Sequence, residues 1–181
     1  MGLGNPGRRF EGTRHNVGFD VVRRVASIRD LSIRKRLFRP YLWSGRGELC
    51  LALPLTYMNR SGEVIPGLMR ATGSSVHDLL VVCDNLDLEP GAVRIKRRGS
   101  SRSHNGLASI MDALDTGDFA RLYVGVGHPG STEGVIDHVL SAPDAGEAPL
   151  YEEAFEVAAR TVLDVADRGL DAAMNQINKR R

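Results

Sequence analysis

The sequence GLGNPGRRFEGTRHNVGF, residues 2–19, holds a tight turn, one histidine and two asparagines within a short span. Pro6 fixes its own φ and biases Asn5 towards an extended conformation, so we expect Asn5 to lie on a rigid turn. His15 stands just before apolar residues at helical spacing, which predict a helix over residues 16–28. A neutral imidazole at the start of a helix is a candidate general base. A single glycine-rich turn or histidine is more often structural, so this interpretation depends on the rest of the chain.

The size and composition of the chain are those of one globular domain. Its 181 residues, 42% hydrophobic and 25% charged, are enough for one full core, and we expect a single domain over residues 1–181. The chain has no apolar run as long as a membrane span and no signal-peptide pattern at its start. Cys50 and Cys83 lie in apolar, strand-like runs, so we interpret them as reduced core residues of a cytoplasmic protein. Nothing in the sequence indicates an obligate oligomer, and we expect a monomer.

Strand-like and helix-like segments alternate along the rest of the chain. The predicted strands cover residues 41–44, 48–53, 79–83, 93–96 and 122–126, of which the first two suit a hairpin. The predicted helices cover residues 61–72, 105–114, 150–168 and 170–177, and residues 31–40 are expected to be irregular. This alternation predicts an α/β fold with a mixed, largely parallel twisted sheet and helices on both faces.

Polar residues stand where the predicted strands end and the next segments begin. They are Asn5, the pair Met58-Asn59, Asp84, and the pair His104-Asn105. In α/β folds ligands bind where strands end and loops begin. We therefore expect these four junctions to meet at one edge of the sheet and to form the functional site.

The net charge of +2 conceals two basic runs. The first contains Arg34, Lys35, Arg36 and Arg39, and the second contains Arg94, Lys96, Arg97, Arg98 and Arg102. A strand's period of two would place Arg94 and Lys96 on the same face. The second run adjoins the His-Asn-Gly turn at residue 104 and indicates a polyanionic partner, whereas the first is equally consistent with a solvated surface.

Six motifs together carry a family resemblance. GLGNPG, TRHNVGF, LPLTYMNRSG, DNLDLEPG, SHNGL and VGVGHPG occur in this order between Gly2 and Leu140. In this the chain resembles the bacterial peptidyl-tRNA hydrolases. The resemblance implies one α/β domain that cleaves the ester between a peptide and the 3′-terminal adenosine of tRNA, without a metal or another cofactor. It also implies that the substrate is held at its acceptor stem and CCA end.

The resemblance also implies roles for individual residues. The catalytic set would be His15 as base, Asp84 as the carboxylate that orients it, and Asn5 beside them. The substrate-binding set would be Phe10, Met58, Asn59, His104 and Asn105. The tRNA-binding set would be Arg94, Lys96, Arg98 and Arg102. His128 and His138 are interpreted as structural residues.

The chemistry of ester hydrolysis suits these residue types. A histidine paired with a carboxylate can take a proton from water, and asparagine amides can donate to the developing oxyanion or to a peptide backbone. Which asparagine serves the oxyanion stays open. The chain contains no G-x-S-x-G motif, and its five histidines are spread too widely along the sequence to indicate a zinc site.

The chain departs from the family pattern at two places that bear on RNA binding. Residues 99–103 contain fewer glycines than the corresponding family loop, so we expect a stiffer loop, and Tyr123 stands where an arginine is common. We expect Arg97, Arg98, Arg102 or Arg121 to offset that loss. Two other functions are considered: an RNA-binding relative without catalysis, and a hydrolase of small esters or peptides. The histidine and carboxylate argue against the first, and the basic runs argue against the second.

Overall fold

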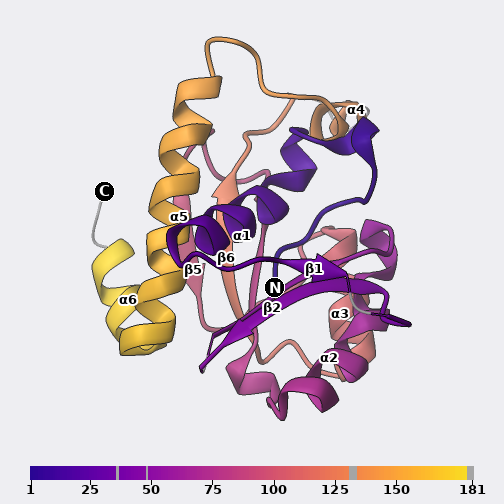
Figure 1. Cartoon of the computed structure of the whole chain (residues 1–181). Helices are drawn as coiled ribbons and strands as arrows, with labels where there is room; N and C mark the ends of the chain where they lie inside the picture. The colour runs from indigo at the N-terminus through magenta and orange to yellow at the C-terminus, as the bar shows by residue number, and fades with distance from the viewer. Residues whose placement is uncertain (36, 48, 131–133, 179–181) are drawn as a thin grey trace.

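A computed structural model describes residues 1–35, 37–47, 49–130 and 134–178 (Figure 1). Its strands are β1 (Arg34–Lys35), β2 (Tyr41–Arg46), β3 (Leu49–Pro54), β4 (Leu80–Asn85), β5 (Val93–Lys96) and β6 (Ala120–Gly125). Its α-helices are α1 (Val17–Ile28), α2 (Ile65–Thr72), α3 (Asn105–Leu114), α4 (Val135–Leu140), α5 (Ala148–Arg168) and α6 (Leu170–Ile177). Short 3₁₀ helices are η1 (Arg8–Phe10), η2 (Arg14–Asn16), η3 (Met58–Val64) and η4 (Val76–Asp78).

The first three residues join two small sheets. One sheet has the order β1-β2-β3, and the other has the order β4-β6-β5. Gly2 donates its N–H to the carbonyl of Ala52 on β3 at 3.0 Å, while Leu3 donates to the carbonyl of Val82 on β4 at 2.9 Å. Val82 in turn donates to the carbonyl of Met1 at 2.8 Å. The segment before the glycine-rich turn therefore lies between β3 and β4, in the middle of the fold.

The α/β class, the mixed pairing and the helices on both faces are confirmed, but parallel pairing does not predominate. β4 pairs parallel with β6, and Gly2 forms a parallel bridge with Val82. The other pairs, β1–β2, β2–β3 and β5–β6, are antiparallel. β2 and β3 are neighbours joined by residues 47–48 alone, whereas parallel neighbours need a crossover of a dozen or more residues. That short connection therefore returns β3 in the opposite direction, while β4 and β5 lie on either side of β6 and do not pair with each other.

Alternate side chains of the central strands enter two cores. Val82 and Leu122 belong to the core beneath α1 and α5, whereas Val81 and Cys83 belong to the core beneath η3, α2 and α3. Figure 1 shows α1 beside α5, and α2 and α3 near each other at the lower right of the view. Cys83 is a buried free thiol, as predicted, and burial raises the pKa of this thiol well above its usual value, whereas Cys50 is only partly buried and packs against the second core.

Most predicted elements occur, and the exceptions have local causes. The predicted helix over 61–72 begins only at Ile65, because Pro66 occupies its first turn and the preceding residues form η3. Residues 34–35 of the segment expected to be irregular form β1, and α4 was not predicted. Among the helices of the described residues, none combines the length and the apolar composition that crossing a bilayer requires.

The packing of η3 on α3 yields a stability prediction. A Cβ at Gly62 would lie 1.9 Å from the backbone oxygen of Ser109, whereas a Cβ at Gly67, inside α2, would meet no atom closer than 3.8 Å. Gly62→Ala should lower the free energy of unfolding by roughly 3 kcal/mol, because one backbone has to move. The control Gly67→Ala should change it by less than about 1 kcal/mol, in the stabilising direction. Urea denaturation measures both, and equal values for the two variants would contradict the packing.

Candidate active site

The four polar junctions of the sequence meet in one cleft of about 750 Å³. Its lining includes all of the predicted catalytic and substrate-binding residues: Asn5, Phe10, His15, Met58, Asn59, Asp84, His104 and Asn105. They come from the N-terminal turn, η1, η2, η3, the end of β4 and the start of α3. Of the predicted tRNA-binding residues, Arg102 lines the cleft.

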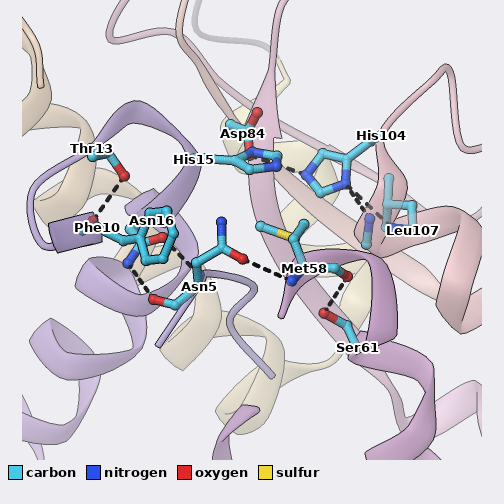
Figure 2. Close-up of polar contacts among 11 residues, drawn as sticks. Asn5, Phe10, Thr13, His15, Asn16, Met58, Ser61, Asp84, His104 and Leu107 are labelled. Carbon is cyan, nitrogen blue, oxygen red and sulfur yellow. Dashed lines mark hydrogen bonds and ion pairs between the residues drawn. The ribbon is translucent and has the colours of Figure 1, made fainter. Parts of the chain in front are cut away.

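At the floor of the cleft, one carboxylate oxygen faces two imidazoles. Oδ1 of Asp84 lies 2.8 Å from Nδ1 of His15 and 3.0 Å from Nε2 of His104 (Figure 2). Asp84 is only 3% exposed. Burial by itself would raise the pKa of this carboxyl, but the facing imidazoles and their hydrogen bonds hold it well below its usual range. Asp84 is therefore an ionised acceptor, and both ring nitrogens donate to it.

The start of α3 determines which nitrogen of His104 carries the proton. Nδ1 of His104 accepts hydrogen bonds from the N–H groups of Gly106 at 3.1 Å and Leu107 at 3.3 Å. A nitrogen that accepts from backbone amides has a lone pair and no proton, so the proton of the neutral ring is on Nε2, towards Asp84. His104 thus acts as a helix cap and as a fixed donor to Asp84.

The same carboxylate determines the state of His15, whose side chain is 12% exposed. Burial lowers the pKa of His15, but the charge of Asp84 and the hydrogen bond to it outweigh burial, so the pKa is raised above 6.5. Because Nδ1 donates to Asp84, the neutral ring has its lone pair on Nε2. His15 therefore presents a basic nitrogen on the side away from the carboxylate.

Asn5 is clamped from two sides. Its backbone N–H donates to Oδ1 of Asn16 at 2.8 Å, and Nδ2 of Asn16 donates back to the Asn5 carbonyl at 3.0 Å. Its side-chain Oδ1 accepts the N–H of Met58 at 2.8 Å (Figure 2). Since the oxygen is occupied, the amide nitrogen is left as the donor group of this cleft residue. The turn that carries Asn5 is held by these hydrogen bonds, and Asn16, which sequence reasoning left without a role, makes two of them.

The remaining lining residues form the walls of the cleft. Met58 is buried beneath it, whereas Asn59 and Asn105 are exposed on its lining. Phe10 packs edge-on against Tyr57, with ring centroids 6.4 Å apart. The helix α4 contributes a further wall that the sequence prediction missed, through Val135, Ile136, Val139 and Leu140. The apolar spacing of VIDHVL was the signal that could have identified it.

The proximity of His15, Asp84 and His104 raises the question of a metal ion. One ligand atom from each lies within 4.8 Å of the others, which spacing along the sequence did not reveal. A histidine bound to a metal ordinarily donates through its other ring nitrogen. The other nitrogen of His104 faces two backbone N–H donors instead. A metal on Nε2 would place donor against donor, so this residue set fits a hydrogen-bonded relay better than a metal centre.

Three of the four cations predicted to bind tRNA, Arg94, Lys96 and Arg98, are not among the residues that line the cleft. Arg94 and Lys96 share one face of β5, and Arg94 stands opposite Tyr123, which lines the cleft. Arg102 forms an ion pair with Asp87 at 2.5 Å. Arg98 is exposed.

Three of the four arginines expected to offset the missing arginine at position 123 make other contacts, one of them Arg102 in its ion pair with Asp87. Arg97 pairs with Asp171 on α6. Arg121 is fully buried, with its guanidinium 4.3 Å from the centroid of the Phe119 ring. Arg121 therefore cannot take over phosphate binding, because its strand position directs it into the core.

The fold and the cleft define an α/β protein whose buried histidine–carboxylate pair suits base-assisted hydrolysis. Comparison with known proteins specifies the family: the peptidyl-tRNA hydrolase family model matches residues 1–181. Peptidyl-tRNA hydrolases of an Exiguobacterium species and of Shouchella clausii are 39% and 38% identical to the chain, and each match covers 98% of both proteins. The crystal structure of the Acinetobacter baumannii peptidyl-tRNA hydrolase, 36% identical, superposes with a TM-score of 0.92 over 98% of this chain and 92% of that one. The chain belongs to the peptidyl-tRNA hydrolase family, and it is a hydrolase of peptidyl-tRNA.

The effect of the Asp84 charge should be measurable in the pKa of His15. In the Asp84→Asn variant the burial of His15 remains while the attraction of the carboxylate is lost, so the pKa of His15 should fall below 6.5. Titration of the imidazole proton signals by NMR, in the wild type and the variant, gives the two values. An unchanged pKa would mean that the carboxylate does not govern the protonation of His15.

Proposed function

We propose that His15 is the general base of this hydrolase and that it activates water against the ester joining the peptide to the 3′-terminal ribose of tRNA. The observation that carries the proposal is the hydrogen bond of 2.8 Å between Nδ1 of His15 and Asp84, which leaves Nε2 as the basic nitrogen in the cleft. Nε2 takes a proton from water as the water oxygen attacks the ester carbonyl. The protonated ring then gives the proton to the leaving ribose oxygen, so that free tRNA and peptide result.

Asp84 and His104 keep the base ready for this step. Asp84 selects the tautomer of His15 and stabilises the imidazolium that forms during the reaction. His104 gives Asp84 a second hydrogen bond, which supports its ionised state in a buried position. His104 is thus proposed to act through Asp84, in addition to forming part of the cleft that receives the substrate.

Asn5 is the proposed donor to the oxyanion. Its Oδ1 is occupied by the N–H of Met58, so Nδ2 is the group that the clamp leaves for the substrate. A single preorganised donor of this kind contributes about 3 kcal/mol to transition-state stabilisation. Asn59 and Asn105, exposed on the lining, are proposed to bind the peptide backbone and the CCA end. Neutral amides recognise backbone groups and so accept peptides of any sequence.

Phosphate binding is assigned to the cations of β5 and of the segment that follows it, of which Arg102 lines the cleft. Arg94 and Lys96 lie on the face of β5 that leads to Tyr123 at the cleft, and Arg98 and Arg102 follow along the chain. A polyanion crossing this face would reach the cleft with its 3′ end. We propose that residues 1–181 act as one unit, because the cation face and the base lie on elements of one connected fold. A binding protein without catalysis would gain nothing from a carboxylate buried between two imidazoles.

Replacement of His15 should greatly reduce turnover and leave the affinity for tRNA nearly unchanged. The His15→Ala variant should lower kcat by at least about 100-fold, the usual contribution of a general base, with little change in tRNA affinity. N-acetyl-aminoacyl-tRNA is the test substrate, aminoacyl-tRNA with a free amine is the negative substrate, and His77→Ala, an exposed histidine on η4, is the matched control. The wild-type kcat/KM should rise with pH as His15 loses its proton, with a midpoint above 6.5 because the pKa is raised. Full activity of His15→Ala would exclude it as the base.

The cation face should control the salt dependence of substrate binding. Replacement of both Arg94 and Lys96 by Ala should raise KM and reduce the slope of log KM against log salt by roughly 1 to 2, since about two phosphate contacts are lost. The control removes two cations of α5, Arg160 and Arg168, and so has the same net charge. Equal slopes for the two double variants would place the RNA elsewhere on the surface.

A further inference from the structure

Arg14, the residue before the proposed base, is a charged side chain that the chemistry above does not use. It lies in η2 and is only 5% exposed. Its guanidinium reaches the segment that connects α4 with α5. Nη1 donates to Oγ of Ser141 at 2.9 Å and to the carbonyl of Ala142 at 2.8 Å, and Nη2 donates to Oε2 of Glu147 at 2.5 Å. The backbone N–H of Arg14 also donates to the carbonyl of Ser141, at 3.0 Å.

The segment held by Arg14 is the end of a cleft wall. Ser141 follows α4 directly, and α4 lines the cleft through four apolar side chains. Oγ of Ser141 also donates to the carbonyl of His138, whose Nε2 lies 2.9 Å from the carbonyl oxygen of Val126 beyond β6. Arg14 therefore links the end of α4 to η2, which carries His15, and His138 links the same helix to the end of β6.

We propose that Arg14 is a positioning residue, which holds the α4 wall of the cleft at a fixed distance from the imidazole of His15. This inference rests on the proposed function of His15, and it assigns Arg14 no contact with the reacting atoms. A planar guanidinium can bind three acceptors in one fixed arrangement, which a lysine ammonium cannot reproduce. A displacement of about 1 Å in such a support is enough to misalign the bound substrate and so to reduce kcat/KM substantially. The buried charge is balanced by Glu147, so the link is both directional and ionic.

The test compares Arg14→Gln, Arg14→Lys and Glu147→Gln with the matched control Arg24→Gln. Arg24 links α1 to Glu152 of α5 at 2.6 Å and lies outside the cleft. Each variant is assayed with N-acetyl-aminoacyl-tRNA below its measured melting temperature. Arg14→Gln should raise KM about tenfold and lower kcat less, because the wall moves while the His15–Asp84 pair stays intact. Arg14→Lys should recover part of the loss, Glu147→Gln should show a smaller change in the same direction, and the control should behave as wild type.

Two further measurements separate positioning from plain stabilisation. Amide hydrogen exchange in residues 135–141 should accelerate in Arg14→Gln and stay unchanged in Arg24→Gln. The midpoint of the kcat/KM pH profile should not move. A lowered melting temperature with unchanged KM and unchanged exchange in α4 would overturn the proposal, and so would a shifted midpoint, which would mean that Arg14 acts on the imidazole itself.

Failure of the proposed function gives a different result. In that case His15→Ala stays active, whereas the exchange of α4 still reports whether Arg14 holds it. If Arg14→Gln does not fold, Arg14→Lys and Glu147→Gln carry the same comparison of KM, kcat and exchange. Unchanged KM and exchange in both of these variants would equally overturn the proposal.

Discussion

The cleft depends on a single ionised carboxylate that the fold buries and then supplies with two donors. A buried, unpaired carboxylate would take up a proton, because transfer of its charge out of water is costly. Asp84 keeps its charge because His15 and His104 both donate to the same oxygen. The backbone amides at the start of α3 complete the arrangement, since they determine the tautomer of His104. The start of α3 thus fixes the proton of His104, His104 stabilises the charge of Asp84, and Asp84 leaves Nε2 of His15 as the basic nitrogen.

Close packing of glycines brings the imidazole of His15 to this carboxylate. A Cβ on Gly18 would lie 2.3 Å from the backbone oxygen of Val82 and 2.5 Å from the N atom of Leu3, so α1 approaches β4 only because that side chain is absent. Asp84 is two residues beyond Val82 on the same strand, and His15 is three residues before Gly18. The close approach of α1 to β4 therefore sets η2 over the end of the strand. In the same way, Gly62 lets η3 lie against α3, which brings Met58 to the start of α3, where His104 is the cap.

Sequence patterns identified what depends on neighbours in the chain and missed what depends on neighbours in space. The helices at 105–114 and 170–177 and the strand at 93–96 were predicted with the observed bounds, because their periodicity and caps are local. The convergence of the polar junctions followed from the general behaviour of strand ends. The two histidines that share Asp84 are far apart in the chain, so counting their spacing could not show that they meet. Arg121 was expected to reach phosphate, and its burial was missed because it follows from the central place of β6 in the sheet, where both faces of the strand are covered.

The charged groups proposed for catalysis and those proposed for RNA binding lie in different surroundings. The charge of the site is enclosed and paired, so dissolved salt screens it weakly, whereas the cations of β5 are at the surface, where screening is strong. Raised salt should therefore weaken attraction of the RNA backbone without altering the protonation of His15. On the proposed assignments, such an enzyme would bind the tRNA through its phosphates and the peptide through its backbone, whatever their sequences. The discrimination that remains must come from the ester itself and from the width of a cleft whose α4 wall is tied to the turn bearing the base.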